Sequence, residues 1–488
     1  MLKRIFSSQL RINMASGTVT MAVNAVVLAV AYPVYLHFLG YEKYGLWLIL
    51  ATVLTFAQLG NLGIDRAVTK LVAEEYGRGG IVAIQKCLTA ALLILVAMGG
   101  IALLAIVAFR ADIVELFKLR GENREIVLSL LPYVGCLTVY VLAVEALNAA
   151  VSGLGRMDLA NYVRTGGRIV KVAVASVLLH RGYGIKGLLI ASVVSYVGIH
   201  AASMIMIRRT ATIRLMRWGN VGRGYYRRLL SFGGPVFGGS LLDMLFHPFN
   251  KVIVSRYVGV EAVPIYDITY TGSMIVRTLI ESGLRALMPE VSRIGAKGMR
   301  DAKQRISVIH KRSIWVIFWF GIPLYVVLAS LAPMLLRLWL GTKFTVALPG
   351  VFRIMLLATF LSLLCVPAYY TLMGLGRTRQ CFLSHVIQGL VNVAVVVTSL
   401  LFLGTLSIGL VASAVMLAMA ATSCYTIGQS RLALKQLHSR VSQPVSKASS
   451  VAPATSACDT TGEYVSRAEQ EDIASTVSRF CLIAERTV

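Results

Sequence analysis

Long apolar stretches separated by short polar segments make up most of the chain. A transmembrane α-helix needs about 20 apolar residues to cross a hydrocarbon core of roughly 30 Å, and most of the stretches reach this length. The twelve stretches are 12–39, 44–64, 87–109, 126–150, 163–180, 185–207, 229–254, 265–287, 313–336, 346–373, 381–403 and 406–427. The pattern predicts an all-α polytopic membrane protein with about twelve transmembrane helices.

The fifth stretch is the most polar of the twelve. Arg164, Arg168 and Lys171 crowd its start. Two interpretations fit equally well: the basic side chains extend from a helix end toward the membrane surface, or they lie on a helix face that contacts water.

The composition supports a membrane protein. The 488 residues are 57% hydrophobic and only 14% charged, with a mean hydropathy of +0.73. Soluble domains are nearer a quarter charged. The seven Cys have no metal-binding or disulfide-type spacing, which argues against a zinc site or a disulfide framework.

The formal net charge of +26 follows from how Lys and Arg are distributed. If the N-terminus is cytoplasmic, 34 of the 48 Lys and Arg fall on the cytoplasmic side, 10 on the opposite side and 4 inside the spans. Cytoplasmic loops of membrane proteins are enriched in these residues and face anionic lipid. We therefore expect both termini in the cytoplasm, an even number of spans, and anionic lipids rather than nucleic acid as partners of the basic loops.

Two short sequences recur in the chain. Gly-Leu-Gly-Arg occurs at 153–156 and at 374–377, and similar valine-rich segments follow at 170–174 and 391–395, each pair 221 residues apart. Gly40 matches Gly259 at an offset of 219. The matches predict an internal duplication. The expected domains are an N-terminal six-helix lobe (1–210), a basic cytoplasmic loop (211–228), a C-terminal six-helix lobe (229–430) and a flexible cytoplasmic tail (431–488).

Charged and polar side chains inside the spans are the candidate site. A charge in the membrane costs several kcal/mol unless it faces water or a partner, so such residues mark functional cavities. Three stripes with helical spacing stand out: Asp243, His247, Asn250 and Lys251; Arg277, Glu281 and Arg285; and His385, Gln388 and Asn392. Other spans add Asn24, Asn61, Arg66, Glu145 and Asn148. Together they predict a hydrated central cavity.

The cations of these stripes suit an anionic substrate. Four cations would bind it, since the guanidinium group of Arg binds phosphate in a forked geometry: Arg277, Arg285, Lys251 and Arg66. The alternative is internal neutralisation: Glu281 would pair with Arg277 and Arg285, and Asp243 with Lys251. His247, Asp243, Glu281 and Glu145 are candidate proton carriers, although ordinary interhelical hydrogen bonds also explain His247 and His385.

Several motifs are missing from the sequence. It contains no GxxxxGK[ST] loop for nucleotide phosphates and no HExxH, GxSxG or metal-ligand cluster. We therefore expect neither a cofactor nor a catalytic metal, and we interpret the protein as a transporter rather than an enzyme.

Short segments around the loops carry a family resemblance. The stretch 38–47 (FLGYEKYGLW), the stretch 62–66 (LGIDR) with 73–77 (AEEYG), and in the second half 258–262 (VGVEA) and 287–293 (LMPEVSR) follow one another in order. They resemble polysaccharide transporters of the multidrug/oligosaccharidyl-lipid/polysaccharide (MOP) exporter superfamily, over about nine-tenths of the chain. The sequence departs from that pattern at Pro264, where the family usually has a small residue such as the Gly45 of the first half.

The resemblance implies two six-helix lobes around a central cavity, as in MATE transporters. It also implies a flippase that moves a polyprenyl-diphosphate-linked oligosaccharide across the bacterial inner membrane by alternating access, with polysaccharide polymerase or ligase machinery as a further partner. A cation-coupled drug exporter of the same superfamily is the alternative. An integral-membrane glycosyltransferase or polymerase would need a catalytic carboxylate motif and a large outer loop, neither of which is visible. A scaffold for polymer-assembly enzymes is a third alternative.

Overall fold

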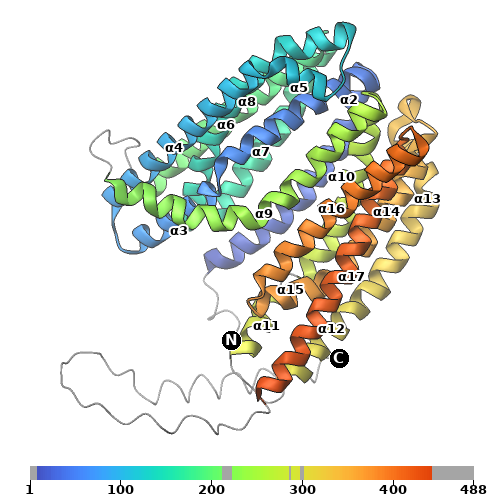
Figure 1. Ribbon diagram of the computed structural model, residues 1–488. Coiled ribbons are helices and arrows are strands. Elements are labelled where there is room, and N and C mark those ends of the chain that lie inside the picture. The colour runs from blue at the N-terminus through green and yellow to red at the C-terminus, as the bar shows by residue number, and fades with distance from the viewer. Residues whose placement is uncertain (1–7, 212–221, 285–286, 297–301, 442–488) are drawn as a thin grey trace, which may run out of the picture. The chain divides into compact units, whose positions relative to one another are not determined.

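Helices account for almost all of the described residues (Figure 1). The computed structural model describes residues 8–211, 222–284, 287–296 and 302–441. The N-terminal lobe contains α2 (Ser8–Ala57), η1 (Gln58–Asn61), α3 (Ile64–Gly77), α4 (Ile81–Ala108), α5 (Arg110–Leu116), α6 (Gly121–Gly153), α7 (Met157–His180) and α8 (Gly184–Ala211). The C-terminal lobe contains α9 (Arg223–Tyr257), α10 (Ala262–Leu284), α11 (Leu287–Ala296), α12 (Ala302–Val316), η2 (Ile317–Gly321), α13 (Ile322–Leu340), η3 (Gly341–Lys343), α14 (Ala347–Leu364), α15 (Val366–Gly374), α16 (Thr378–Leu403) and α17 (Ile408–Val441).

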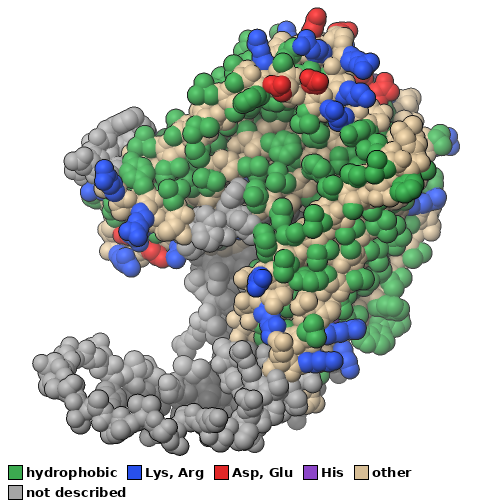
Figure 2. All heavy atoms as spheres, viewed as in Figure 1, with side chains coloured by type: hydrophobic (Ala, Val, Ile, Leu, Met, Phe, Trp, Pro, Cys, Tyr) green, Lys and Arg blue, Asp and Glu red, His purple; other side chains and the backbone are tan. Residues whose placement is uncertain are grey.

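The twelve predicted stretches correspond to these helices. The first two share α2, whose helical path breaks at Gly40 with φ 68° and ψ −178°. The ninth runs through α12, η2 and α13, and the tenth covers α14 and α15. Within the described residues, eight helical segments are long and apolar enough to span a membrane, and the first of them includes both parts of α2. The more polar α7, α9 and α10 are not among the eight. Figure 2 shows an apolar surface between charged ends.

The second predicted stretch, 44–64, extends beyond the end of its helix. It was expected to run to residue 64, but α2 ends at Ala57 and the short η1 follows. Leu62 and Gly63 are both left-handed, with φ of 48° and 70°. Two such residues in succession cannot continue a right-handed helix, so the chain turns and starts the separate helix α3.

The predicted duplication has a structural counterpart. α6 and α15 end at Gly153 and Gly374, and both are followed by a left-handed glycine, Gly155 (φ 82°) and Gly376 (φ 73°). Each turn is closed by the same pair of backbone hydrogen bonds, in which the residue after the glycine reaches back five positions. Glycine adopts this conformation without the steric cost of a Cβ atom. The repeated Gly-Leu-Gly-Arg sequence is thus a repeated helix-ending turn in the two lobes.

Two expected domain boundaries fall at or beyond the edge of the described residues. Most of the loop 211–228 lies outside them, although α9 already begins at Arg223. The start of the tail is helical, because α17 continues to Val441, and residues 442–488 lie outside the described part.

One continuous hydrophobic core includes residues of both lobes. It joins Leu36 and Leu46 of α2 with Val263 and Tyr266 of α10, all nearly or fully buried. Pro264, the departure from the family pattern, lies in the first turn of α10, where a proline costs no helical hydrogen bond. The two lobes therefore pack directly against each other along α2 and α10.

Contacts between the lobes join the middle part of α2 to the start of α10 and to the end of α13. The indole Nε1 of Trp339 donates to the carbonyl of Ala29 at 2.7 Å, and the hydroxyl of Tyr41 donates to the carbonyl of Lys343 at 2.7 Å. A Cβ atom on Gly45 would lie 2.3 Å from the carbonyl oxygen of Val260. A glycine is required at this close approach of two backbones.

Replacing Gly45 with Ala should therefore push the lobes apart and destabilise the protein by about 1–3 kcal/mol, as overpacking does elsewhere. The measurement is thermal unfolding of the purified protein in detergent. Gly100→Ala is the matched control, because a Cβ atom there meets nothing within 4 Å and α4 continues on both sides. Equal melting temperatures for the two variants would contradict the close contact.

Candidate functional site

A buried carboxylate on α10, Asp267, holds together three polar side chains. Its Oδ1 lies 2.6 Å from the Nζ of Lys251 and 3.1 Å from the Nε2 of His247, both on α9. Its Oδ2 accepts a hydrogen bond of 2.7 Å from the hydroxyl of Tyr32 on α2. Asp267 is 5% exposed and Lys251 is 8% exposed. This cluster joins the two lobes, since Tyr32 belongs to the N-terminal lobe and the other members to the C-terminal lobe.

The cluster gives Lys251 a partner that the sequence analysis did not name. Internal neutralisation was expected to pair Lys251 with Asp243, and in the structure the Lys251 ammonium pairs with Asp267. The side chain of Asp243 lies outside the described part of the structure. The sequence contained the signal, because Asp267, Tyr270, Arg277 and Glu281 recur at helical spacing and extend the predicted stripe toward the start of α10.

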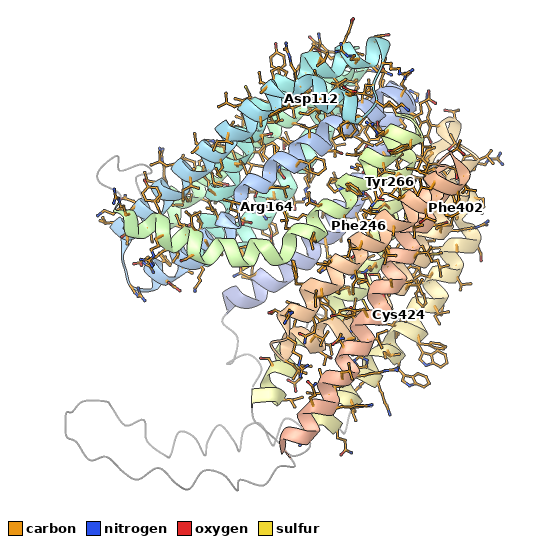
Figure 3. The ribbon with its side chains drawn as sticks, in the orientation of Figure 1. Asp112, Arg164, Phe246, Tyr266, Phe402 and Cys424 are labelled. Atoms are coloured by element: carbon orange, nitrogen blue, oxygen red, sulfur yellow. The ribbon has the colours of Figure 1, made fainter. Side chains whose placement is uncertain are left out.

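Aromatic rings enclose the histidine of this cluster. The imidazole of His247 stacks on Tyr270 at 4.3 Å and on Tyr266 at 5.4 Å between ring centroids. Figure 3 labels Phe246 on α9 and Tyr266 on α10, the two neighbouring helices. A role for His247 in carrying protons stays a prediction.

Three of the predicted asparagines link helices. Asn392 on α16 donates to the side-chain oxygen of Asn250 on α9 at 3.0 Å, and both residues are buried. Asn148 on α6 is fully buried and donates to the carbonyl of Ala160 on α7 at 3.3 Å. Interhelical hydrogen bonds of this kind stabilise helix association in membranes. Asn24 is half-buried, and its side-chain oxygen has no hydrogen-bond partner within the described residues.

A pocket of about 210 Å³ within the C-terminal lobe contains four of the predicted residues. They are Arg277, Glu281, His385 and Gln388. An Nη1 of Arg277 lies 3.1 Å from Glu281, which also accepts a hydrogen bond of 2.9 Å from the hydroxyl of Tyr370. The charge of Arg277 is therefore compensated where it lies. Arg285, the third member of the predicted stripe, lies outside the described residues.

A second pocket, of about 310 Å³, brings together three predicted residues of the N-terminal lobe, Asn61, Arg66 and Glu145, but not Asn24 or Asn148. Its lining is Gln58, Asn61, Gly63, Asp65, Arg66, Val141, Leu142, Glu145, Arg164, Arg168 and Met244. The last of these comes from α9 of the other lobe, so the pocket lies where the lobes adjoin. We call it the N-lobe pocket; Figure 3 labels Arg164 on α7.

Arginines outnumber carboxylates in the N-lobe pocket. Three Arg side chains, at 66, 164 and 168, face two carboxylates, Asp65 and Glu145. The single ion pair among the lining residues joins Arg164 Nη2 to Glu145 Oε2 at 2.7 Å, and the Arg164 side chain is still 42% exposed. The buried Nε of Arg164 has no hydrogen-bond partner within the described part of the chain. The pocket thus has cationic donors left over for an anion.

The cationic lining continues along one face of α7. Arg164, Arg168 and Lys171 recur at i, i+4 and i+7, which places them on the same side of the helix. The ammonium of Lys171 lies 5.4 Å from the ring centroid of Trp47 on α2. Two of these three cations, Arg164 and Arg168, line the N-lobe pocket, and the choice between a helix end at the membrane surface and a face in contact with water stays open. Arg164 and Arg168 were not predicted as site residues, although their spacing was the signal.

Asn61 and Glu145 hold the N-lobe pocket in place. The side-chain oxygen of Asn61 accepts the backbone N–H of Asp65 at 3.2 Å and so caps the start of α3. Glu145 orients Arg164 from α6. Both residues were predicted on spans, and they now have defined supporting contacts.

Long apolar helices, eight of them long enough to span a membrane within the described residues, define a polytopic membrane protein. The chain belongs to a family of polysaccharide biosynthesis proteins, whose sequence profile matches residues 37–349. It is 20% identical to a putative O-antigen transporter from Shigella flexneri over 356 residues, which are 71% of this chain and 80% of that protein.

Two solved structures have the same fold. An inward-facing multidrug resistance MATE transporter of the MOP superfamily superposes with a TM-score of 0.70 at 13% identity, covering 86% of this chain and 96% of that one. The lipid II flippase MurJ, in an inward closed conformation, superposes with a TM-score of 0.66 at 13% identity, covering 88% and 90%.

The ion pair between Asp267 and Lys251 predicts how substitutions in the cluster change the stability of the protein. Asp267→Asn should destabilise the protein strongly, by about 3–5 kcal/mol, because it leaves the buried Lys251 ammonium without its counter-charge. Adding Lys251→Met should recover most of the loss, since neither charge then remains. Thermal unfolding measures both, with the exposed Asp112→Asn as control. A double variant as unstable as the single one would contradict the pairing.

Proposed function

We propose that the protein is a flippase for a polyprenyl-diphosphate-linked oligosaccharide, a repeat unit of O-antigen, capsule or exopolysaccharide. It would move this lipid across the bacterial inner membrane by alternating access. Membership of a polysaccharide biosynthesis family and the likeness to a putative O-antigen transporter support this proposal. The distribution of Lys and Arg supports cytoplasmic termini.

The observation that carries the proposal is the excess of arginine in the N-lobe pocket. A diphosphate diester bears about two negative charges and several acceptor oxygens, and Arg binds such groups through paired N–H donors. Arg66 and Arg168 form no ion pair within the described residues, and Arg164 has an unpartnered Nε. The C-terminal lobe is a poorer match, because Arg277 and Lys251 are each paired with a carboxylate.

Movement of the lobes would give the substrate access from alternate sides. Polar contacts between the lobes include Tyr32 with Asp267, Trp339 with Ala29, and Tyr41 with Lys343. Others come from α9, where Arg228 pairs with Glu74 and Glu75, and Ser255 and Arg256 donate to the end of α5. Alternating access requires contacts between the lobes to rearrange while the helices within each lobe stay packed together. We divide the chain for this purpose into lobes 1–210 and 229–430, joined by the loop 211–228.

A cation-coupled exporter of small molecules is the second candidate. The fold likeness to a multidrug resistance transporter and the Arg277–Glu281–His385 pocket favour it. It predicts that carboxylates dominate the binding site, because its substrates are typically cationic. The surplus of arginine in the N-lobe pocket favours the flippase.

Arg164→Gln and Arg168→Gln should each reduce translocation at least tenfold, because each removes a charge-assisted contact to the diphosphate. The measurement is the appearance of a polyprenyl-diphosphate-linked glycan on the far side of proteoliposomes. Arg78→Gln is the matched control: it removes an exposed arginine outside the pocket. Translocation at the wild-type rate in both pocket variants would contradict the assignment.

The variant Glu145→Gln tests whether the Glu145–Arg164 pair affects binding through its charge or only supports the fold. It removes a carboxylate from the pocket and frees Arg164, so affinity for the diphosphate should rise about two- to tenfold while Arg164→Gln lowers it. Equilibrium binding of a fluorescent polyprenyl diphosphate measures both changes. Losses of similar size in the two variants would show that the pair only supports the fold.

A further inference from the structure

A second cationic pocket, of about 370 Å³, lies at the helix ends where α5 meets α6. We call it the α5–α6 pocket; its lining is Ala111, Val114, Glu115, Lys118, Leu119, Arg120, Arg124 and Arg256. Four cations face a single carboxylate there. None of the four forms an ion pair within the described residues. Figure 2 shows basic and acidic side chains together at this end of the molecule, where Figure 1 labels α5.

The backbone of Lys118 adopts a left-handed conformation that glycine adopts at the equivalent turns of this protein. Lys118 follows the end of α5 in the left-handed region, with φ 55°, and its N–H bonds back to the carbonyl of Glu115 at 2.9 Å. The equivalent positions after α6 and α15 are Gly155 and Gly376. A lysine pays a steric cost there that glycine avoids, and strain of this kind is characteristic of functional positions.

The start of α6 adds uncapped backbone donors to the same pocket. Arg120 is the N-cap residue of α6 and makes no side-chain capping hydrogen bond. The first N–H groups of a helix have no acceptor within the helix and carry the positive end of its dipole, which Glu122 in the first turn of α6 offsets in part. Arg120 and Arg124 flank these groups. The combination of free N–H donors and flanking cations suits a phosphate group.

Arg256 brings the other lobe into the pocket. This residue of α9 donates from Nη1 to the carbonyls of Glu115 and Leu116, at 3.0 and 3.2 Å. Next to it, the hydroxyl of Ser255 donates to the carbonyl of Phe117 at 3.0 Å. The pocket is therefore complete only while α9 remains docked on the end of α5.

An apolar groove of about 420 Å³ adjoins the other side of α5. Phe56, Met98 and Phe109 line it, and Ile113 and Leu116 contribute the α5 face. The helix α5 separates the cationic pocket from the groove. One of its faces, with residues 111 and 115 and the following residue 118, lines the pocket, and the opposite face, with residues 113 and 116, lines the groove. A lipid with an anionic headgroup and a long apolar chain matches this pair of surfaces.

We propose that the α5–α6 pocket is an exit site that holds the diphosphate of the transported lipid on the outer side of the membrane, with its polyprenyl chain along the apolar groove. The proposal rests on the proposed function and on the orientation that the basic loops indicate. Four cations against one carboxylate give a local surplus of three charges, which matches a diphosphate better than the single charge of a phospholipid phosphodiester. Because Arg256 completes the site, occupancy favours the arrangement in which α9 contacts α5.

The test is equilibrium binding of a fluorescent polyprenyl diphosphate to the full chain in phosphatidylcholine nanodiscs. The background variant is Arg164→Gln/Arg168→Gln, so that remaining binding reports the exit site and not the N-lobe pocket. Adding Lys118→Gly or Arg124→Gln should weaken this binding about five- to tenfold. Lys118→Gly relieves the left-handed strain, so its melting temperature should stay equal or rise. Arg181→Ala, an exposed cation outside the pocket, is the control.

Three outcomes would overturn the exit site. One is unchanged binding in Lys118→Gly and Arg124→Gln; another is no binding in the background variant. The third is equal competition by phosphatidylglycerol and by unlabelled diphosphate, which would make the pocket a general phospholipid site. The failure of the proposed function is separate, because it would appear as an absence of translocation by the unmodified protein in proteoliposomes.

Discussion

A charged side chain inside a membrane must be satisfied by a partner or by water, and the interior of this protein is arranged around that constraint. In the C-terminal lobe the described charged side chains pair with one another: Asp267 contacts Lys251 and His247, and Glu281 pairs with Arg277. In the N-lobe pocket they do not, because Arg66, Arg164 and Arg168 share two carboxylates. One lobe is therefore close to electrically balanced at its buried sites, and the other keeps positive charge available for an anionic substrate.

The same constraint ties the lobes together. Asp267 accepts a hydrogen bond from Tyr32 across the boundary between lobes, so the balanced cluster of one lobe is also a contact with the other. Nearby, Gly45 allows the backbone of α2 to reach Val260. A movement that separates these surfaces would leave Asp267 with Lys251 and His247, which keeps the carboxylate compensated. The contact can thus break without exposing an unpaired charge to hydrocarbon.

The sequence was sufficient for the fold and only partly sufficient for the site. The twelve apolar stretches all fall on helices, although eight segments of the described residues are long and apolar enough to span a membrane. The Gly-Leu-Gly-Arg repeat marked two turns that are closed by the same pattern of backbone hydrogen bonds. The turn at Leu62–Gly63 escaped prediction, because a leucine in a left-handed conformation has no sequence signature. Periodicity places residues on a helix face but cannot say which face meets which. It therefore could not show that Lys251 meets Asp267, that Asn250 meets Asn392, or that Arg164 and Arg168 line the pocket of Asn61, Arg66 and Glu145.

The most direct test of the central claim is the position of the bound lipid. A cryo-EM map of the protein reconstituted with a polyprenyl-diphosphate-linked sugar should show density for the diphosphate in the N-lobe pocket, within hydrogen-bonding distance of Arg164 and Arg168 on α7. Density at the Arg277–Glu281 pair instead, with the N-lobe pocket empty, would contradict the account.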